Sequence, residues 1–130
     1  MVTNTYNKKL IFIFDDDVYL AEMVRQTLLA EGYSNVVFHD GIHLIDQIAE
    51  KHPDLILLDI KMPGMNGNEI LQQIRKDFNT PVIMLTGLSS SDSIALSIEL
   101  GADDYISKPF YPQELISRIK AKLRRYNVNH

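Results

Sequence analysis

The 130-residue sequence contains no cysteine, which excludes disulfide bonds and thiolate metal sites. Residues 1–9 lack the apolar core of a signal peptide, and no apolar run in the chain is long enough to span a membrane. A chain without these features is compatible with a reducing compartment. We therefore expect a cytoplasmic protein that does not interact with a membrane.

Basic residues are also in the minority, with 13 lysines and arginines against 17 aspartates and glutamates and a net charge of −4. A domain with this balance lacks the positive charge with which proteins bind nucleic acids. Hydrophobic residues make up 45% of the chain, a usual share for a folded domain. The length fits one domain, and there is no internal repeat, low-complexity segment or internal linker. We expect contact with DNA only through an additional output domain.

Short apolar runs alternate along the chain with longer segments of helical periodicity. We predict strands over residues 10–14, 35–38, 54–59, 81–85 and 103–107. We predict helices over residues 18–31, 40–51, 66–77, 92–100 and 112–126, with Asp40 capping the second and Pro112 in the first turn of the last. This alternation predicts an α/β fold, a (βα)5 doubly wound sheet of five parallel strands in the flavodoxin-like order 2-1-3-4-5.

Acidic residues follow two of the predicted strands. Asp59 ends the third strand, and Asp15, Asp16 and Asp17 follow the first. In a parallel sheet the carboxyl ends of all strands lie at one edge, where open α/β sheets bind ligands. Several carboxylates close together repel one another unless a cation lies among them. The pattern predicts a divalent metal site with a reactive aspartate, whereas Asp17 is better placed to cap the following helix.

Two further polar residues follow the last two predicted strands. Thr86 comes directly after the fourth predicted strand, and Lys108 comes directly after the fifth. A threonine at a strand end and a surface lysine are each common, but here both are predicted to converge with Asp59 at the same edge. The four histidines show no ligand spacing, and we assign them no function.

Four segments of the chain resemble the receiver domain of two-component response regulators, and the resemblance covers nearly the whole length. It implies a phosphorylation-activated signalling domain that accepts a phosphoryl group from a sensor histidine kinase. Each segment alone is a weak signal, whereas all four in this order and at this spacing are a strong one. We assign residues 1–126 to the receiver domain and residues 127–130 to a tail or the start of a linker to an output domain. The segments are residues 14–17 (FDDD), 57–67 (LLDIKMPGMNG), 82–87 (VIMLTG) and 101–110 (GADDYISKPF).

The resemblance implies a role for each of the acidic residues. Asp59 would be the phosphoacceptor, whose carboxylate attacks phosphorus and forms an acyl phosphate. Mg²⁺ would be bound directly by Asp16 and Asp59, through water by Asp15, and by the backbone carbonyl of Lys61. The metal would offset the negative charge of the incoming phosphoryl group.

The same resemblance implies roles in catalysis and switching for three other residues. The positive charge of Lys108 would pair with one phosphoryl oxygen, and the Thr86 hydroxyl would donate a hydrogen bond to another. Thr86 and the loop 87–93 would then move toward the phosphate, and Tyr105 would turn inward into the space that they leave. Such a domain is no enzyme in the usual sense, but it would assist its own phosphorylation and its slow dephosphorylation.

The last predicted helix resembles receivers that continue into a winged-helix DNA-binding domain, the OmpR/PhoB-like subclass, which regulates transcription. Receivers of this subclass form homodimers on phosphorylation through salt bridges, and Asp104, Glu114 and Arg118 match that pattern. Ile94 departs from it, because a basic partner for Glu114 is expected at this position.

Two other functions stay open at this point. Residues 15–17 also match the Asp-x-Asp motif of haloacid-dehalogenase-like phosphatases, with Asp15 as the nucleophile. In that family a lysine precedes an acidic pair, whereas here an acidic pair precedes Lys108, and Asp59 would have no role. The third possibility is an unphosphorylated interaction module of the same fold.

Overall fold

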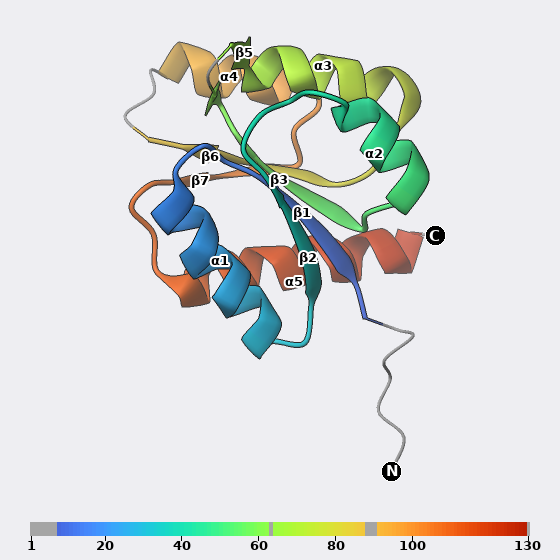
Figure 1. Ribbon diagram of the computed structural model, residues 1–130. Helices are drawn as coiled ribbons and strands as arrows, with labels where there is room; N and C mark the ends of the chain where they lie inside the picture. Colours follow the sequence, from blue (N-terminus) through green and yellow to red (C-terminus); the bar gives the residue numbers. More distant parts are fainter. Residues whose placement is uncertain (1–7, 63, 88–90, 130) are drawn as a thin grey trace.

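The computed structural model describes residues 8–62, 64–87 and 91–129, which form a five-stranded parallel sheet with helices on both faces (Figure 1). The strands lie in the order β2-β1-β3-β6-β7, and every neighbouring pair is parallel. Counted within this sheet the order is 2-1-3-4-5, so the predicted fold class is confirmed. The strands are β1 Leu10–Phe14, β2 Ser34–Phe38, β3 Leu55–Asp59, β6 Val82–Thr86 and β7 Asp104–Ser107.

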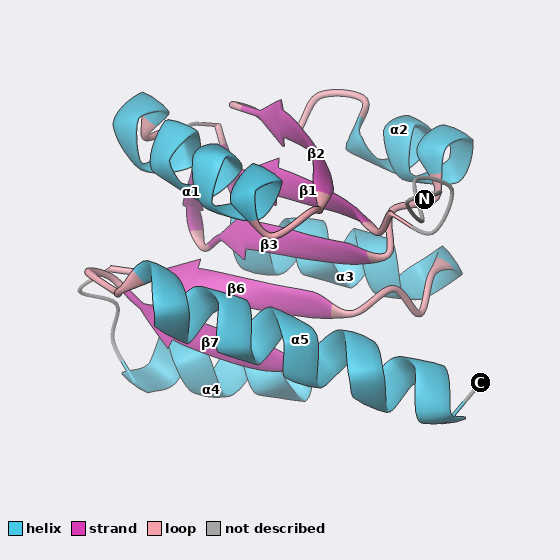
Figure 2. Ribbon diagram, turned by 90° about the horizontal axis from the view of Figure 1, so that it is seen from below, coloured by secondary structure: helices cyan, strands magenta, loops and turns pink. Residues whose placement is uncertain are grey.

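The helices form two layers, one on each face of the sheet (Figure 2). Helices α1 Val18–Ala30 and α5 Pro112–Asn129 lie on one face, and α2 Leu44–Lys51, α3 Gly67–Asp77 and α4 Ser91–Glu99 lie on the other. Because the central strands are covered on both faces, their sequences are continuous apolar runs rather than alternating ones. Within the described residues, no helix is both long and apolar enough to cross a membrane.

Successive side chains of β1 join two separate hydrophobic cores. Ile11 and Ile13 pack on the side of α1 and α5, whereas Phe12 and Phe14 pack on the side of α2 and α3. All four side chains are fully buried, and each contributes about 1.5–3 kcal/mol of hydrophobic stabilisation. The Phe14 ring also stacks on Phe38 of β2, with 4.5 Å between the ring centroids. The acidic residues that follow β1 therefore start from a strand that is firmly held.

The predicted capping residue is confirmed for α1 but not for α2. Asp17 caps α1, as predicted, because its Oδ1 accepts from the backbone N–H three residues later at 3.1 Å. The prediction that Asp40 caps the second helix is wrong, since α2 begins only at Leu44. The Asp40 carboxylate instead accepts from the N–H of Ile42 at 2.9 Å and closes a local turn. His43 then precedes the helix in the left-handed conformation, with φ of 63°.

The structure also contains a small hairpin that the sequence did not predict. Strand β4 Lys61–Met62 pairs antiparallel with β5 Met65–Asn66 directly after the end of β3. Two residues per strand are too few for a periodic pattern. At the other end of the chain, α5 runs to Asn129 and takes in most of the predicted tail 127–130, because no proline or glycine follows Pro112 to stop it. Residue 130 lies outside the described part.

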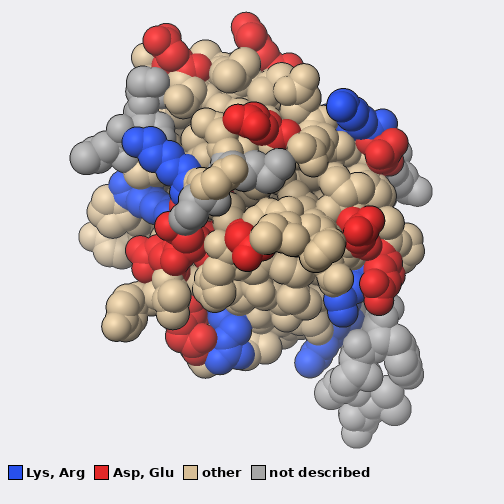
Figure 3. All heavy atoms as spheres, turned by 45° about the horizontal axis from the view of Figure 1, so that its top comes forward, with Lys and Arg blue, Asp and Glu red and all other residues tan. Residues whose placement is uncertain are grey.

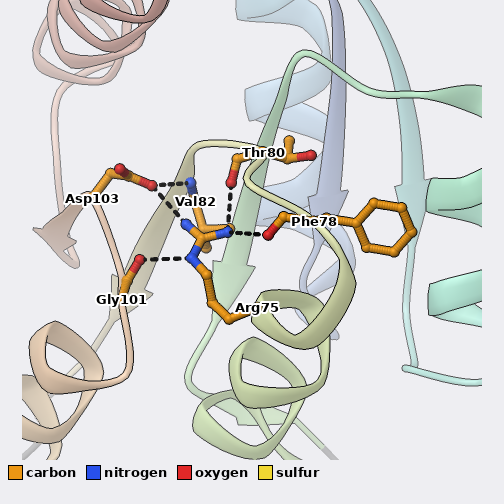
Figure 4. A network of polar contacts seen from close by, with 6 residues as sticks. All are labelled: Arg75, Phe78, Thr80, Val82, Gly101 and Asp103. Atoms are coloured by element: carbon orange, nitrogen blue, oxygen red, sulfur yellow. Dashed lines mark hydrogen bonds and ion pairs between the residues drawn. The ribbon is translucent and has the colours of Figure 1, made fainter.

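Arg75 near the end of α3 connects two turns at the amino-terminal edge of the sheet (Figure 4). Its guanidinium donates to the carbonyls of Thr80 at 2.8 Å and Gly101 at 3.0 Å, and it forms an ion pair with Asp103 at 2.8 Å. Asp103 also accepts from the N–H of Val82 at 2.8 Å. These contacts fix the start of β6 and the connection from α4 to β7, at the edge opposite the strand ends that carry Asp59 and Thr86.

Candidate functional site

Four polar side chains come from the carboxyl ends of four strands. Asp59 and Thr86 are the last residues of β3 and β6, and Asp15 and Lys108 directly follow β1 and β7. All these strands are parallel within one sheet, so the four residues lie at the same edge. The structure therefore brings together residues that lie far apart in the sequence, although their chemical roles stay predictions.

Lys108 lies between two buried carboxylates. Its Nζ is 2.9 Å from Asp15 Oδ2 and 3.3 Å from Asp59 Oδ2. Asp15 is fully buried, and Asp59 is 6% exposed. One lysine therefore faces two carboxylates that solvent hardly screens, and Asp16 adds a third negative charge beside them.

The carboxylates of Asp15, Asp16 and Asp59, which we call the acidic cluster, are arranged so that one metal ion could bind to all three. Each offers an oxygen, and these oxygens lie within 4.8 Å of one another. Asp16 is exposed, so the cluster is open to solvent on that side. The Lys61 N–H donates to Asp59 Oδ1 at 3.3 Å, which places the residue with the fourth predicted ligand beside Asp59. Oxygen donors with excess negative charge fit a hard cation such as Mg²⁺.

The electrostatics of the cluster favour a bound cation. Burial and the neighbouring Asp15 raise the pKa of Asp59 to about 6, although Lys108 and the Lys61 N–H favour the charged form. Burial opposes the charge of Lys108, but attraction to Asp15 and Asp59 outweighs it and raises the pKa of Lys108. At neutral pH the site thus holds a charged lysine and an Asp59 anion that its surroundings destabilise. A cation among the carboxylates would relieve this destabilisation.

The Thr86 hydroxyl is buried at the end of β6, with 1% of the residue exposed. Among the described residues its Oγ1 has no hydrogen-bond partner. The contact of Asp15 Oδ2 is the ion pair with Lys108 at 2.9 Å. Since a buried hydroxyl is rarely left without a partner, Thr86 is available to donate to an oxygen of a bound anion.

Gly67 begins α3 directly against the backbone of Asp59. Its N–H donates to the carbonyl of Ile60 at 2.6 Å. A Cβ atom at this position would overlap the carbonyl oxygen of Asp59 and would lie 2.7 Å from the Cα of Ile60. Only glycine allows this approach, so the start of α3 is packed onto the segment that carries Asp59.

The structure places Tyr105 in β7, where the residue is 37% exposed. An outward-facing ring is the starting position that its predicted switch role requires, and the role itself stays a prediction. Of the predicted switch loop 87–93, residues 88–90 lie outside the described part.

The three residues predicted for a dimer interface lie together, but their contacts are within one chain. Arg118 is 2.9 Å from Asp104 and 3.4 Å from Glu114. A dimer that uses them would have to add partner contacts to this group or replace some of its present ones.

One residue next to the site was missed by the sequence analysis. The Nδ1 atom of His39 lies 2.9 Å from the backbone carbonyl of Asp15. A single histidine after a predicted strand has no spacing that would indicate such a contact.

Comparisons with known proteins agree with this geometry. Residues 11–120 match the family described as the response regulator receiver domain. The DNA-binding response regulator MtrA of Mycobacterium leprae (strain TN) is 44% identical over 115 residues, which cover 88% of this chain and 51% of that protein. MtrA of Mycobacterium tuberculosis (strain ATCC 25618 / H37Rv) is also 44% identical over 115 residues, which cover 50% of it. The chain spans about half the length of these curated relatives.

Solved structures give the same result. The CheY-like response regulator receiver domain protein of Methanospirillum hungatei JF-1 superposes with a TM-score of 0.90 at 33% identity, covering 95% of this chain and 100% of that one. The BeF3-activated receiver domain of Klebsiella pneumoniae RstA gives a TM-score of 0.84 at 34% identity, covering 89% and 99%.

The fold and the site thus define a signalling domain rather than an enzyme in the usual sense. The chain belongs to the family of response regulator receiver domains. This membership decides against the haloacid-dehalogenase-like phosphatase, because that alternative assigns the chain to another family.

Proposed function

We propose that this domain accepts a phosphoryl group on Asp59 from a sensor histidine kinase, with Mg²⁺ bound by the acidic cluster. The observation that carries this proposal is the contact of Lys108 with two buried carboxylates, at 3.3 Å from Asp59 and 2.9 Å from Asp15. The same edge holds Asp16 and a Thr86 hydroxyl that has no partner among the described residues. These are the groups that transfer of a phosphoryl group to a carboxylate needs.

The transfer proceeds by attack of the Asp59 carboxylate on the phosphorus of a phosphohistidine. The bond from phosphorus to the histidine nitrogen breaks as the bond to the Asp59 oxygen forms, which gives an acyl phosphate. With its pKa at about 6, Asp59 is mostly ionised at neutral pH and attacks without first losing a proton. Lys108 pairs with one phosphoryl oxygen, and the Thr86 hydroxyl donates to another. The acidic cluster and the Lys61 carbonyl would hold Mg²⁺, which would supply further positive charge at the phosphoryl group.

Large apolar side chains are exposed near the acidic cluster and support a protein as the phosphoryl donor. Val18 and Tyr19 start α1, directly after the acidic residues, and are 59% and 90% exposed. Tyr111, three residues after Lys108, is 81% exposed. Exposed apolar side chains mark a docking surface where they form one patch. A histidine kinase that covers them would bring its phosphohistidine to Asp59.

Phosphorylation then changes the surface of α4, β7 and α5. The Thr86 hydroxyl gains an acceptor in the phosphoryl group, and Tyr105 turns from its exposed position into the space that Thr86 leaves. The acyl phosphate is later lost by slow autodephosphorylation at the same site.

The curated relatives suggest what the switched surface controls, since they are DNA-binding response regulators of about twice this length. We propose that this receiver acts in the cytoplasm and regulates transcription through a DNA-binding output domain. Acidic side chains are spread over the face in Figure 3, with no single basic patch on this face. The net charge of −4 fits a domain that does not bind DNA itself. On phosphorylation, Asp104, Glu114 and Arg118 form salt bridges in a homodimer.

The experiment that tests this function is the intact mass of the protein after incubation with acetyl phosphate and Mg²⁺. We expect the wild-type chain to gain one phosphoryl group and the Asp59→Asn variant to gain none. Asp46→Asn, which changes an aspartate with an 82% exposed side chain, serves as the matched control and should gain one as well. A phosphoryl group on Asp59→Asn would contradict the assignment, and no gain in any variant would favour the unphosphorylated interaction module.

A further inference from the structure

Phe38 and His39, at the end of β2, form hydrogen bonds with the backbone N–H and the backbone carbonyl of Asp15. Its N–H donates to the carbonyl of Phe38 at 3.1 Å, which continues the ladder between β1 and β2 past their last paired residues. Its carbonyl accepts from the ring of His39, whose Nδ1 is 2.9 Å away. Because a carbonyl oxygen can only accept, Nδ1 carries the proton in this contact.

The His39 ring takes the place that a backbone N–H would occupy if the ladder continued. In a parallel ladder the next donor to the Asp15 carbonyl would be the N–H of Asp40. The chain turns away at that point, since the Asp40 carboxylate accepts from the N–H of Ile42 at 2.9 Å. The side chain of His39 therefore satisfies a carbonyl that the end of β2 would otherwise leave without its ladder partner.

This hydrogen bond acts on the peptide that joins Asp15 to Asp16, two members of the acidic cluster. The Asp15 carboxylate is also held by other contacts, because Oδ1 accepts from the Asp17 N–H at 2.9 Å and Oδ2 pairs with Lys108. Asp16 is exposed, and the direction of its side chain depends on the peptide before it. Rotation of that peptide would redirect the Asp16 side chain, whose oxygen lies within 4.8 Å of those of Asp15 and Asp59.

We propose that His39 is a positioning residue of the metal site, whose Nδ1–H orients the Asp15–Asp16 peptide so that the acidic cluster binds Mg²⁺. This inference rests on the proposed function, because it concerns the metal of that same site. The proposal assigns the orientation of this peptide to the Nδ1–H donor of His39 and not to the charge of the imidazole ring. Contacts that orient metal ligands from outside are known to strengthen metal binding.

Three substitutions separate the donor from the rest of the side chain. His39→Asn keeps an N–H at the same number of bonds from Cα as Nδ1, His39→Gln moves it to the position of Nε2, and His39→Ala removes it. We expect His39→Ala and His39→Gln to bind Mg²⁺ about two- to tenfold more weakly, the equivalent of one hydrogen bond. His39→Asn should stay within about twofold of the wild type. The Mg²⁺ dissociation constant is measured from the melting temperature as a function of Mg²⁺ concentration.

The matched control is His43→Asn, at an exposed histidine in the left-handed conformation that asparagine tolerates. It should bind Mg²⁺ as the wild type does. A second measurement needs no variant, because ¹⁵N NMR of the metal-free wild type should find the neutral His39 ring protonated on Nδ1.

Several results would overturn the role of His39. These are a ring protonated on Nε2, wild-type Mg²⁺ binding in His39→Ala, or a loss in His39→Asn as large as in His39→Ala. A wild-type chain that does not bind Mg²⁺ would instead contradict the proposed metal site, and this inference with it. The two failures are therefore distinguishable.

Discussion

The raised pKa of Asp59 makes the stability of the domain depend on pH. The pKa of this carboxyl is about 6 in the folded state against 3.8 for the free group, so the unfolded state releases its proton at lower pH. The free energy of unfolding should therefore fall as pH rises through this range, by at most about 3 kcal/mol. Asp59→Asn removes this titration. We expect its stability relative to the wild type to increase by about 1–3 kcal/mol between about pH 4 and about pH 7 in metal-free buffer.

Urea unfolding of both proteins at a series of pH values measures this difference. Asp46→Asn, at an exposed aspartate outside the acidic cluster, should follow the wild type at every pH. A gap between wild type and Asp59→Asn that is the same at both ends of the range would show that burial does not raise this pKa.

Individual site residues could be predicted where they end a strand. Asp59 and Thr86 each end an apolar run, Lys108 follows the last predicted strand, and a parallel sheet brings such ends to one edge. The contact of His39 could not be predicted, because it depends on the turn at Asp40 and on the direction of one ring. Neither leaves a periodic pattern in the sequence. The sequence also could not show that the Thr86 hydroxyl is buried without a partner among the described residues, since packing alone decides this.

A buried polar contact joins α3, which follows the Asp59 segment, to α4, which follows β6. The Ser97 hydroxyl of α4 donates to Asn68 Oδ1 of α3, and Asn68 Nδ2 donates to the carbonyl of Ser93 at 3.4 Å. Asn68 and Ser97 are 5% and 1% exposed. Removing one partner leaves the other buried without this bond. We expect Ser97→Ala to lower the free energy of unfolding by about 1–3 kcal/mol, as measured by urea titration.

A double-mutant cycle with Asn68→Leu tests the reason for that loss. The double variant replaces both polar groups, so it should be destabilised by less than the sum of the two single variants. Ser117→Ala, at an exposed serine of α5, is the matched control and should change stability by less than about 0.5 kcal/mol. Additive losses would show that the two side chains do not depend on each other.

Helices and strands could be predicted wherever their burial requires a regular pattern of apolar residues. The three central strands β1, β3 and β6 are apolar runs because helices cover both of their faces. Helices α2 and α3 each bury one apolar face. The start of α2 could not be predicted, because the Asp40 carboxylate is used in a turn rather than in a cap. The β4–β5 hairpin could not be predicted, because strands of two residues show no periodicity. The Arg75 contacts could not be predicted either, because its guanidinium bonds to turns that lie far apart in the sequence.

For the whole molecule, metal binding at the acidic cluster is linked to global unfolding, because the cluster is built on β1 and β3 in the middle of the sheet. These strands are buried along almost their whole length, so the ligands cannot come together unless the core has formed. We therefore expect Mg²⁺ to stabilise the folded state over the unfolded one. At a concentration about tenfold above its dissociation constant it should add about 1.4 kcal/mol, which raises the melting temperature by several degrees.

Two variants distinguish specific binding from a general effect of salt, with NaCl of equal ionic strength as the reference. Asp59→Asn should melt above the wild type without metal at neutral pH, because it removes a buried charge beside Asp15, and Mg²⁺ should raise its melting temperature less. Asp16→Asn changes an exposed residue, so it should melt near the wild type without metal and also respond less to Mg²⁺. An equal rise in all three proteins would mean that Mg²⁺ acts elsewhere. The expected order instead follows from one cause: the metal-free domain holds the buried carboxylates of Asp15 and Asp59 together at the ends of β1 and β3, and the cation that would relieve their repulsion is the one that the proposed phosphorylation would use.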